Sequence, residues 1–423
     1  MKRVLSSASF RAFSAIAGTA FVILTWTAPS ADAAPRMLVD VTTGQVIEHE
    51  DAFQRWYPAS LTKLMTAYVA FRAMASGEAE PTSPVTISAK ANAEPPSKMY
   101  YGEGATMTLD AALKIIMVKS ANDVAMAIGE SLAGSERAFV ERMNAEAARI
   151  GMISTRFINP HGLPGEGQYT TARDMAVLAQ ALKREFPQYA EYFSLEAIKA
   201  GDNTYENFNM LIGRFPGADG MKTGFICSSG FNQVSSASRN GRSVVAVVFG
   251  AESLADRAEQ SAELLHKGLS TPSVTRETLA NLQPYGETRD QIVDLRPQIC
   301  SPEAAAARGE GRDDEGELIL NSRYLPPLTR ELEAVTVSLG GTGGRVAAIA
   351  ADVPVPTPRP NLIELGDIQN APVRAEIAAG AALDADGSEG EQSASVLPAS
   401  EPAVSDVLRP ALTVPLPKPR PAL

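Results

Sequence analysis

The chain has 423 residues, of which 45% are hydrophobic and 21% are charged, and its formal net charge is −11. This composition is typical of a soluble globular protein, and the length allows a catalytic domain with a further region beside it. The negative charge argues against a nucleic acid as the partner, but an acidic substrate remains possible because one local positive pocket is enough to hold a carboxylate.

The amino terminus has the pattern of an export signal. Three basic residues, Lys2, Arg3 and Arg11, precede an apolar run over 15–26, and small residues follow at 31–34. This order predicts a secretory signal peptide over 1–33. The apolar run is shorter than the roughly 20 residues of a membrane span, and an uncleaved anchor is the alternative. We therefore expect an exported chain, which is periplasmic if the cell has an outer membrane.

From residue 34 to residue 270, strand-like and helix-like segments alternate, which predicts a mixed α/β catalytic domain. A first hairpin is expected from 37–41 and 46–49. The predicted helices cover 60–75, 109–118, 121–132, 136–150, 171–183 and 257–267. Between the last two, strands over 230–236 and 243–250 are joined at Asn240-Gly241, which is a strong local hairpin signal.

The character of the sequence changes after about residue 270. We expect 271–351 to be a poorly defined extension, in which 335–339 and 345–351 pair as a small hairpin. From 352 to 423, proline, alanine, glycine and acidic residues dominate without periodicity, which predicts a largely disordered tail that turnover does not need. Its two proline-rich stretches, 353–360 and 414–421, are expected to be polyproline helices that serve as solvated spacers or as docking arms.

Few residues in this chain are suited to metal or thiol chemistry. Cys227 and Cys300 are too few for a cysteine-based zinc site, but export permits one structural disulfide between them, with two free thiols as the alternative. His49 and His266 are isolated, and no ligand set has the spacing of a metal site. We therefore expect one disulfide and neither a metal nor another cofactor.

The candidate chemistry lies in three short motifs, Ser60-Leu61-Thr62-Lys63, Ser120-Ala121-Asn122 and Lys222-Thr223-Gly224. Each is weak alone, but the three in this order are a specific signal. In the first motif, the spacing puts Ser60 Oγ and Lys63 Nζ on one helix face. A serine hydroxyl needs a proton acceptor, and Lys63 becomes one if burial and a nearby cation, for which Lys222 is the candidate, lower its pKa. An ordinary solvated helix face is the alternative.

The other two motifs are expected to border the same cleft. Ser120 is predicted to relay a proton to the leaving amine, and Asn122 to hold Lys63 and a substrate carbonyl. Taken alone, Ser120 would be the N-cap of the next helix. The third motif is predicted to begin a strand, where Gly224 lets a peptide lie alongside while Lys222 and Thr223 face a carboxylate.

These motifs and their surroundings resemble the low-molecular-mass penicillin-binding proteins that are D-alanyl-D-alanine carboxypeptidases. The resemblance covers about 37–267 and is carried by 57–66, 119–123, 157–163, 171–174 and 219–224. It implies a transpeptidase/β-lactamase-like fold of class α/β (α+β), in which helices flank an antiparallel sheet. The implied substrate is the peptidoglycan stem peptide, and β-lactams are the implied covalent inhibitors.

The resemblance also implies a role for each site residue. Ser60 would be the acylated nucleophile, Lys63 its base, and Ser120 and Asn122 helpers. Lys222, Thr223 and Gly224 would bind substrate, the backbone N–H groups of Ser60 and Phe225 would form an oxyanion hole, and Arg257 would pair with a carboxylate. An unrelated surface arginine paired with Glu259 is the alternative for the last of these. His161 lies in a matched motif but is interpreted as structural, because Lys63 already supplies the base.

Three other functions remain as alternatives. A D,D-endopeptidase shares all three motifs, and a non-catalytic binding module would not need them. A class A β-lactamase has Asp where this chain has Ala121, and the segment 317–321, which resembles its deacylation motif, comes after Lys222-Thr223-Gly224 instead of before it. Better-known members of the family add a β-rich second domain and a membrane-binding amphipathic helix. Neither is evident after residue 270, so membrane attachment stays open.

Overall fold

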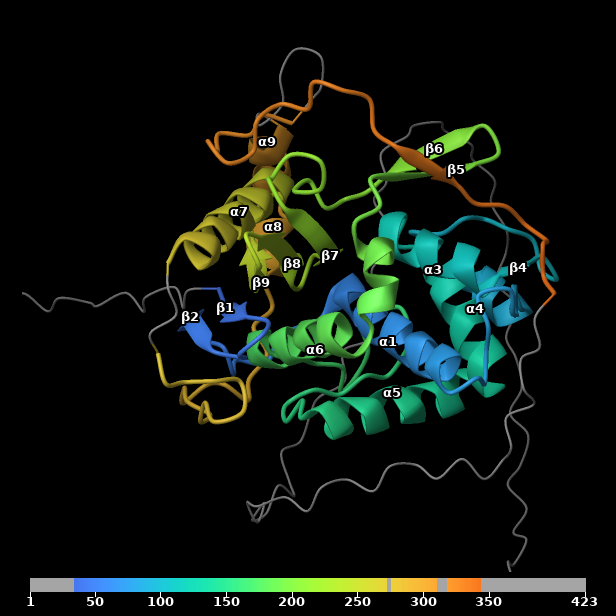
Figure 1. Ribbon diagram of the computed structural model, residues 1–423, viewed down its shortest axis with the longest axis horizontal. Coiled ribbons are helices and arrows are strands. Elements are labelled where there is room, and N and C mark those ends of the chain that lie inside the picture. Colours follow the sequence, from blue (N-terminus) through green and yellow to red (C-terminus); the bar gives the residue numbers. More distant parts are fainter. Residues whose placement is uncertain (1–33, 272–274, 310–317, 344–423) are drawn as a thin grey trace, which may run out of the picture. The chain divides into compact units, whose positions relative to one another are not determined.

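A computed structural model describes residues 34–271, 275–309 and 318–343, all of which lie in one compact unit (Figure 1). The predicted signal peptide, the tail from 352 and the segment 345–351 fall outside these residues. The helices are α1 (Thr62–Ala75), α2 (Ala89–Ala93), α3 (Leu109–Val118), α4 (Asn122–Ala133), α5 (Glu136–Ile150), α6 (Ala172–Glu185), α7 (Leu254–Ser270), α8 (Arg296–Ile299) and α9 (Pro302–Gly309), with 3-10 helices η1 (Ala59–Leu61) and η2 (Pro187–Phe193). The strands are β1 (Arg36–Asp40), β2 (Val46–Glu50), β3 (Pro84–Thr86), β4 (Thr106–Thr108), β5 (Ala197–Ala200), β6 (Asn203–Glu206), β7 (Ala218–Ile226), β8 (Gly230–Arg239), β9 (Arg242–Ala251) and β10 (Ala334–Thr336).

The main sheet has the strand order β2-β1-β9-β8-β7, and every neighbouring pair is antiparallel, which confirms the predicted class. Strand β9 is buried on both faces. Successive side chains of a strand point in opposite directions, so its residues alternate between two cores. Val245 and Val247 join the core on the side of α1 and α6, whereas Val244 and Val248 join the core beneath α7. The sheet is therefore the middle layer between α7 and the helical region (Figure 1).

Helix α1 lies at the centre of the helical region, and almost all of its residues are buried. A helix that is apolar on most of its surface must be enclosed by other elements, and α1 contacts α3, α4, α5 and α6. The nucleophile motif lies at its amino-terminal end, between this region and the sheet. Residues 60–75 were predicted as one helix, but the chain forms η1 first and α1 begins two residues after Ser60.

Several predicted elements are confirmed and others are shifted. The structure has α3 and α5 at their predicted bounds, and both hairpins of the main sheet are present. Asn240 and Gly241 both have positive φ, as a two-residue hairpin turn requires. The expectation that Lys222-Thr223-Gly224 begins a strand is wrong, because β7 begins at Ala218. The two-stranded sheet β3–β4 and the short hairpin β5–β6 were not predicted.

The extension after α7 returns along the catalytic body. Leu279 and Leu282 enter the core on the α1 side, and Leu325 enters the core beneath α7. Strand β10 then pairs in parallel with β5 and completes a three-stranded sheet of order β10-β5-β6 (Figure 1). The predicted hairpin between 335–339 and 345–351 lies partly outside the described residues.

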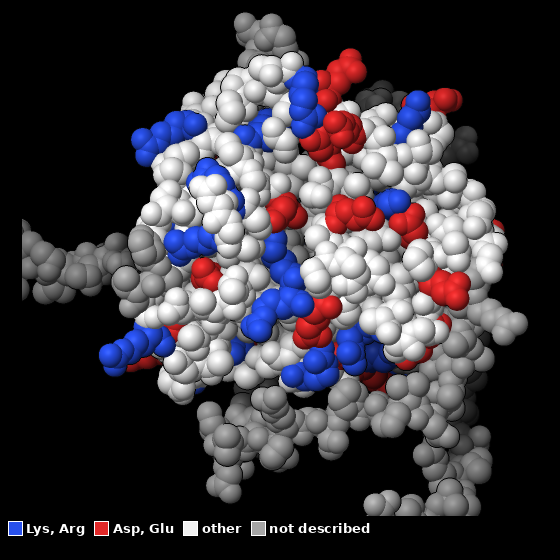
Figure 2. Space-filling model, viewed as in Figure 1, with Lys and Arg blue, Asp and Glu red and all other residues white. Residues whose placement is uncertain are grey.

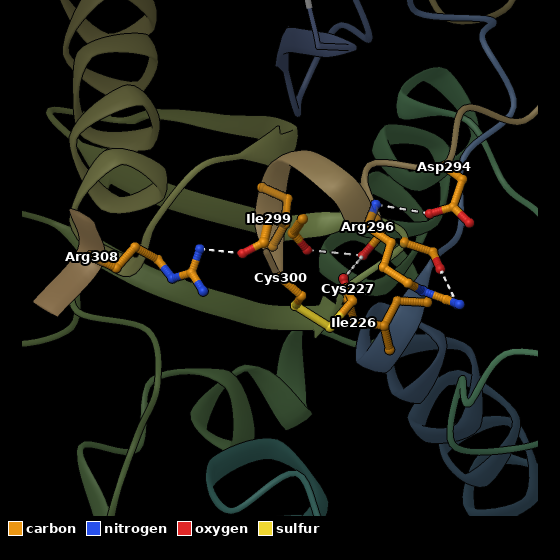
Figure 3. The surroundings of a disulfide bond; sticks show 10 residues. Ile226, Cys227, Asp294, Arg296, Ile299, Cys300 and Arg308 are labelled. Carbon is orange, nitrogen blue, oxygen red and sulfur yellow. Dashed lines mark hydrogen bonds between the residues drawn. A yellow bond between two sulfur atoms is a disulfide. The ribbon is translucent and has the colours of Figure 1, made fainter. Parts of the chain in front are cut away.

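A disulfide fastens this extension to the strand that carries the third motif (Figure 3). Cys227 directly follows β7, and Cys300 directly follows α8. Two hydrogen bonds support the junction, from Leu295 N to Ser228 O at 3.0 Å and from Arg296 Nη2 to Ser228 Oγ at 3.0 Å. The end of β7 is thus tied both covalently and by hydrogen bonds.

We expect removal of this disulfide to lower the free energy of unfolding by roughly 2–4 kcal/mol, because the link closes a long loop in the unfolded chain. Its two cysteines are 73 residues apart. Denaturant unfolding of Cys227→Ala/Cys300→Ala against the unsubstituted protein measures the change. The same unsubstituted protein under reducing conditions is the matched control, and equal stability in all three samples would contradict the prediction.

Candidate active site

The first two motifs meet at the side chain of Lys63, which is fully buried. Its Nζ lies 3.0 Å from Ser60 Oγ, 2.7 Å from Asn122 Oδ1 and 2.8 Å from the backbone oxygen of His161. The nucleophile, its candidate base and the Asn of the second motif are therefore in direct contact. The contact with the His161 carbonyl could not be read from the sequence.

Burial holds the pKa of Lys63 well below its ordinary value, and the positive charge of Lys222 lowers it further. The sequence-based expectation of a nearby cation is thus confirmed. A neutral lysine has two N–H donors and one lone pair. The Asn122 and His161 oxygens accept the two N–H groups, which leaves the lone pair for the hydroxyl proton of Ser60.

Asn122 is held in one orientation by the loop before it. Its Nδ2 donates to Pro95 O at 3.0 Å and to Pro96 O at 3.1 Å, so Oδ1 faces Lys63. Both amide hydrogens are used in this way. The expectation that Asn122 also contacts a substrate carbonyl is therefore not supported by this arrangement, whereas its contact with Lys63 is present.

Ser120 has an unusual backbone and an unpaired side chain. Its φ is +63°, a region that costs a non-glycine residue energy, and its Oγ is buried without a hydrogen-bond partner among the described residues. The N-cap of α4 is Ala121, so the reading of Ser120 as a helix cap is wrong. A strained residue with an unsatisfied buried hydroxyl is typical of a functional position.

Strand β7 lies directly against the turn that carries Ser60. A Cβ on Gly224 would come within 3.1 Å of Pro58 O and Ser60 N, so a larger residue would push the strand away. The next residue, Phe225, has a side chain that is 40% exposed and lies against Phe231, with ring centroids 4.3 Å apart. The close approach puts the backbone of β7 beside the Ser60 N–H.

A second close approach fixes the other side of the turn. Gly162 has a φ of +90°, and a Cβ there would lie 1.8 Å from Ala59 O. Asn159 Oδ1 accepts a hydrogen bond from Gly162 N at 2.7 Å, which holds the loop in place. The loop is what brings the His161 carbonyl to Lys63, and only glycine fits at its closest point.

His161 itself is held by neighbours on both ring nitrogens. Its Nε2 is 3.1 Å from Glu94 Oε2, and its Nδ1 accepts from Leu163 N at 3.2 Å. Burial lowers the pKa of His161, although Glu94 opposes this shift. Among the described residues the ring has hydrogen-bond partners in Glu94 and Leu163 and none in Ser60, which agrees with a structural role.

The third motif and Arg257 add two further buried cations. Lys222 is 1% exposed and Arg257 is 2% exposed. Burial, with the Arg257 charge as a second cause, lowers the pKa of Lys222 to about 7. Burial lowers the pKa of Arg257 to about 9, which still leaves the guanidinium charged at neutral pH. Lys222 Nζ donates a hydrogen bond to Thr223 O at 3.1 Å.

Arg257 has an incomplete set of partners. Its Nη2 donates to Phe208 O at 2.9 Å, its Nε has no partner, and no carboxylate of a described residue is within salt-bridge distance. The alternative of a surface arginine paired with Glu259 is therefore wrong. Buried cations without counter-ions favour the binding of an anion, since a charge out of water needs a partner.

Within the described ranges, no cluster of three or more His, Cys, Asp or Glu side chains is arranged to hold a metal ion. No described helix has the length and apolar character that crossing a membrane requires. On the face shown in Figure 2, basic and acidic side chains are interspersed, and they do not form a continuous surface of one sign.

Comparison with known proteins gives one consistent family. The family model described as D-alanyl-D-alanine carboxypeptidase, peptidase family S11, matches residues 23–253. The chain is 35% identical to the D-alanyl-D-alanine carboxypeptidase DacA of Escherichia coli K12 over 324 residues, 73% of this chain and 80% of that protein. It is also 35% identical to DacD of the same organism over 247 residues, 57% of this chain and 64% of that protein, slightly less than two thirds of its length.

A solved structure agrees with the sequence relatives. Penicillin-binding protein 5 from Haemophilus influenzae superposes with a TM-score of 0.54 at 32% identity, over 58% of this chain and 72% of that one. The matched region contains all three motifs and the strand and helices that position them. The chain therefore belongs to the D-alanyl-D-alanine carboxypeptidase family of serine peptidases.

Proposed function

We propose that this chain removes the terminal D-alanine from peptidoglycan stem pentapeptides through an acyl-enzyme on Ser60. The observation that carries the proposal is the hydrogen bond between Ser60 Oγ and a buried Lys63 Nζ, next to cations that have no counter-ion among the described residues. The first feature supplies an activated nucleophile. The second supplies a site for the carboxylate at the end of the stem peptide.

In the acylation step, Ser60 Oγ attacks the carbonyl carbon of the penultimate D-alanine, and the hydroxyl proton passes to neutral Lys63. The oxyanion is stabilised by the backbone N–H groups of Ser60 and Phe225, which the close packing of Gly224 against Ser60 N brings together. The unpaired Ser120 hydroxyl relays a proton to the departing amine as the peptide bond breaks. An ester to Ser60 and free D-alanine are the products.

Deacylation repeats these roles with water as the nucleophile. Lys63 takes a proton from the water, the water oxygen forms a bond to the acyl carbon, and Ser60 Oγ leaves and recovers its proton. The trimmed peptide is released with a new carboxyl end. A β-lactam presents a strained acyl group and a carboxylate to the same site, and the ester it leaves on Ser60 is expected to be long-lived.

The direct test is release of D-alanine from a synthetic stem pentapeptide by the purified exported chain. Turnover of the pentapeptide supports the proposal. Cleavage of cross-linked muropeptides without D-alanine release would favour the D,D-endopeptidase, and rapid penicillin hydrolysis would favour the β-lactamase. Failure of all three, with correct folding, would favour a binding module.

Carboxylate recognition is proposed for Lys222, Thr223 and Arg257, and Arg257 gives the sharper test. We expect Arg257→Gln to lower kcat/KM on a pentapeptide by about ten- to hundredfold, because a charge-assisted hydrogen bond to the carboxylate is lost. The same peptide with an amidated end should be affected little. Thermal unfolding checks the fold, and Arg296→Gln, which removes a guanidinium outside the cluster, is the control. An equal loss on both peptides would contradict the assignment.

We also propose that the chain acts outside the cytoplasm, in the periplasm where the cell has an outer membrane. The amino-terminal signal pattern supports this. Stem peptides and β-lactams are the proposed ligands. A nucleic acid is not proposed, because the net charge is −11.

A further inference from the structure

A groove of about 330 Å³ lies beside the candidate site and has no role in the mechanism above. This volume is at the lower end of the roughly 300–1,000 Å³ of small-ligand sites. Its lining includes side chains from four parts of the chain: Lys119, Tyr205, Phe208, Met210, Leu254 and Leu318. Leu318 comes from the extension after α7, so the extension supplies one wall of the groove.

Two connections place this groove next to the carboxylate end of the site. The backbone oxygen of Phe208 accepts the hydrogen bond from Arg257 Nη2, and Leu254 precedes Arg257 by one turn of α7. On the other side, Lys119 is the residue directly before Ser120. The groove therefore adjoins both the proposed carboxylate partner and the proposed proton relay.

The groove is lined mostly by apolar side chains, but it also includes two charged residues of opposite sign, Lys119 and Glu206. Phe208 is 44% exposed, although large apolar side chains are usually covered, and Leu254 and Met210 lie near it. Lys119 Nζ lies 4.8 Å from the centroid of the Tyr205 ring. Lys119 forms no salt bridge with a described residue, so its charge is available to a ligand.

We propose that this groove binds the side chain of the residue that leaves, and that the enzyme therefore releases D-amino acids larger than alanine. The inference rests on the proposed carboxypeptidase function. In the leaving residue, the side chain and the carboxylate are attached to the same α-carbon. A carboxylate bound at Arg257 therefore puts the side chain at the mouth of the groove. The ligand class is a D-amino acid with an apolar stem of several carbons, and a carboxylate at the end of the stem would pair with Lys119 while facing Glu206.

The test compares peptides that end in D-Ala-D-Xaa, where Xaa is alanine, norleucine or 2-aminoadipate. With the unsubstituted protein, we expect kcat/KM for release of D-norleucine to lie within about tenfold of that for D-alanine, because the groove gives the longer chain a place to bind. In Leu318→Arg, which fills the groove, the ratio of the two should fall by about tenfold. Ile319→Arg is the matched control, because that side chain is 42% exposed and does not line the groove.

Lys119→Met tests the polar end of the groove. It should lower the ratio of 2-aminoadipate to norleucine release by about tenfold, through loss of one charge-assisted contact. Unchanged ratios in both Leu318→Arg and Lys119→Met, or norleucine release more than a hundredfold slower than alanine release in the unsubstituted protein, would overturn the subsite while leaving the proposed function intact. Absence of release from every peptide, D-alanine included, would overturn both.

Discussion

Ser60→Ala is expected to abolish both D-alanine release and covalent labelling by a penicillin. The hydroxyl of Ser60 is the only group that the proposed mechanism acylates, and removal of a nucleophile from such a site costs roughly 10⁴-fold or more in kcat. Labelled penicillin followed by peptide mapping should place the label on Ser60 in the unsubstituted protein. Label at another residue, or undiminished labelling of the variant, would refute the mechanism.

Lys63→Met should produce a loss of similar size with the fold retained. The variant keeps an apolar stem in the buried position but removes the lone pair that accepts the Ser60 proton. It also removes the donors to Asn122 and His161, so thermal unfolding must be measured alongside the acylation rate. Lys98→Met is the matched control, because its Nζ lies at the surface over the Tyr100 ring, outside the Lys63 contacts.

Lys222→Met is expected to make the protein more stable while it loses activity on carboxylate substrates. Burial lowers the pKa of Lys222 to about 7 from an ordinary value of 10.5, so the folded state holds this proton less tightly than the unfolded state does. At about 1.4 kcal/mol for each pKa unit, the cost of burying the charge is about 5 kcal/mol below pH 7. The variant also loses the hydrogen bond to Thr223 O, which reduces its expected gain in stability by about 1 kcal/mol.

The pH dependence of that gain distinguishes its cause. Between about pH 7 and pH 10.5 the unfolded state binds more protons at Lys222, so the stability of the unsubstituted protein rises with pH relative to the variant. The advantage of Lys222→Met should therefore be largest below pH 7 and shrink as pH rises toward 10.5. Denaturant unfolding at pH 6, 8 and 9.5 measures it, and a constant difference would show that packing is the cause.

The sequence was most informative where local signals and burial agree. Helix α5 is bounded by Ser135, whose side chain accepts a hydrogen bond from Ala138 N, and by Gly151 with a φ of +87°. Both ends could therefore be predicted from the sequence. The same is true of the Asn240-Gly241 hairpin. Strands of three or four residues, such as β5 and β6, contain too few residues to show a period, and their pairing with β10 depends on contacts distant in the sequence.

In the site, the motifs identified which side chains meet but not how they are held. The contact between Ser60 and Lys63 follows from helical spacing, whereas the His161 carbonyl reaches Lys63 through a loop from a distant part of the chain. The positive φ of Ser120 has no sequence signal, because serine usually avoids that conformation. The burial of Arg257 could not be predicted from the sequence either. Arg257 lies in the first turn of α7, and only contacts with distant parts of the chain bury its side chain.

The disulfide that joins β7 to the extension also has a consequence for the order in which an exported chain matures. During secretion the amino-terminal part emerges first, and Cys227 has no partner until the 73 residues after it have followed. The strand β10, the buried Leu325 and the groove wall at Leu318 emerge later still. With the proposed export, the catalytic body is thus completed only after the extension has followed it into a compartment that allows disulfides to form.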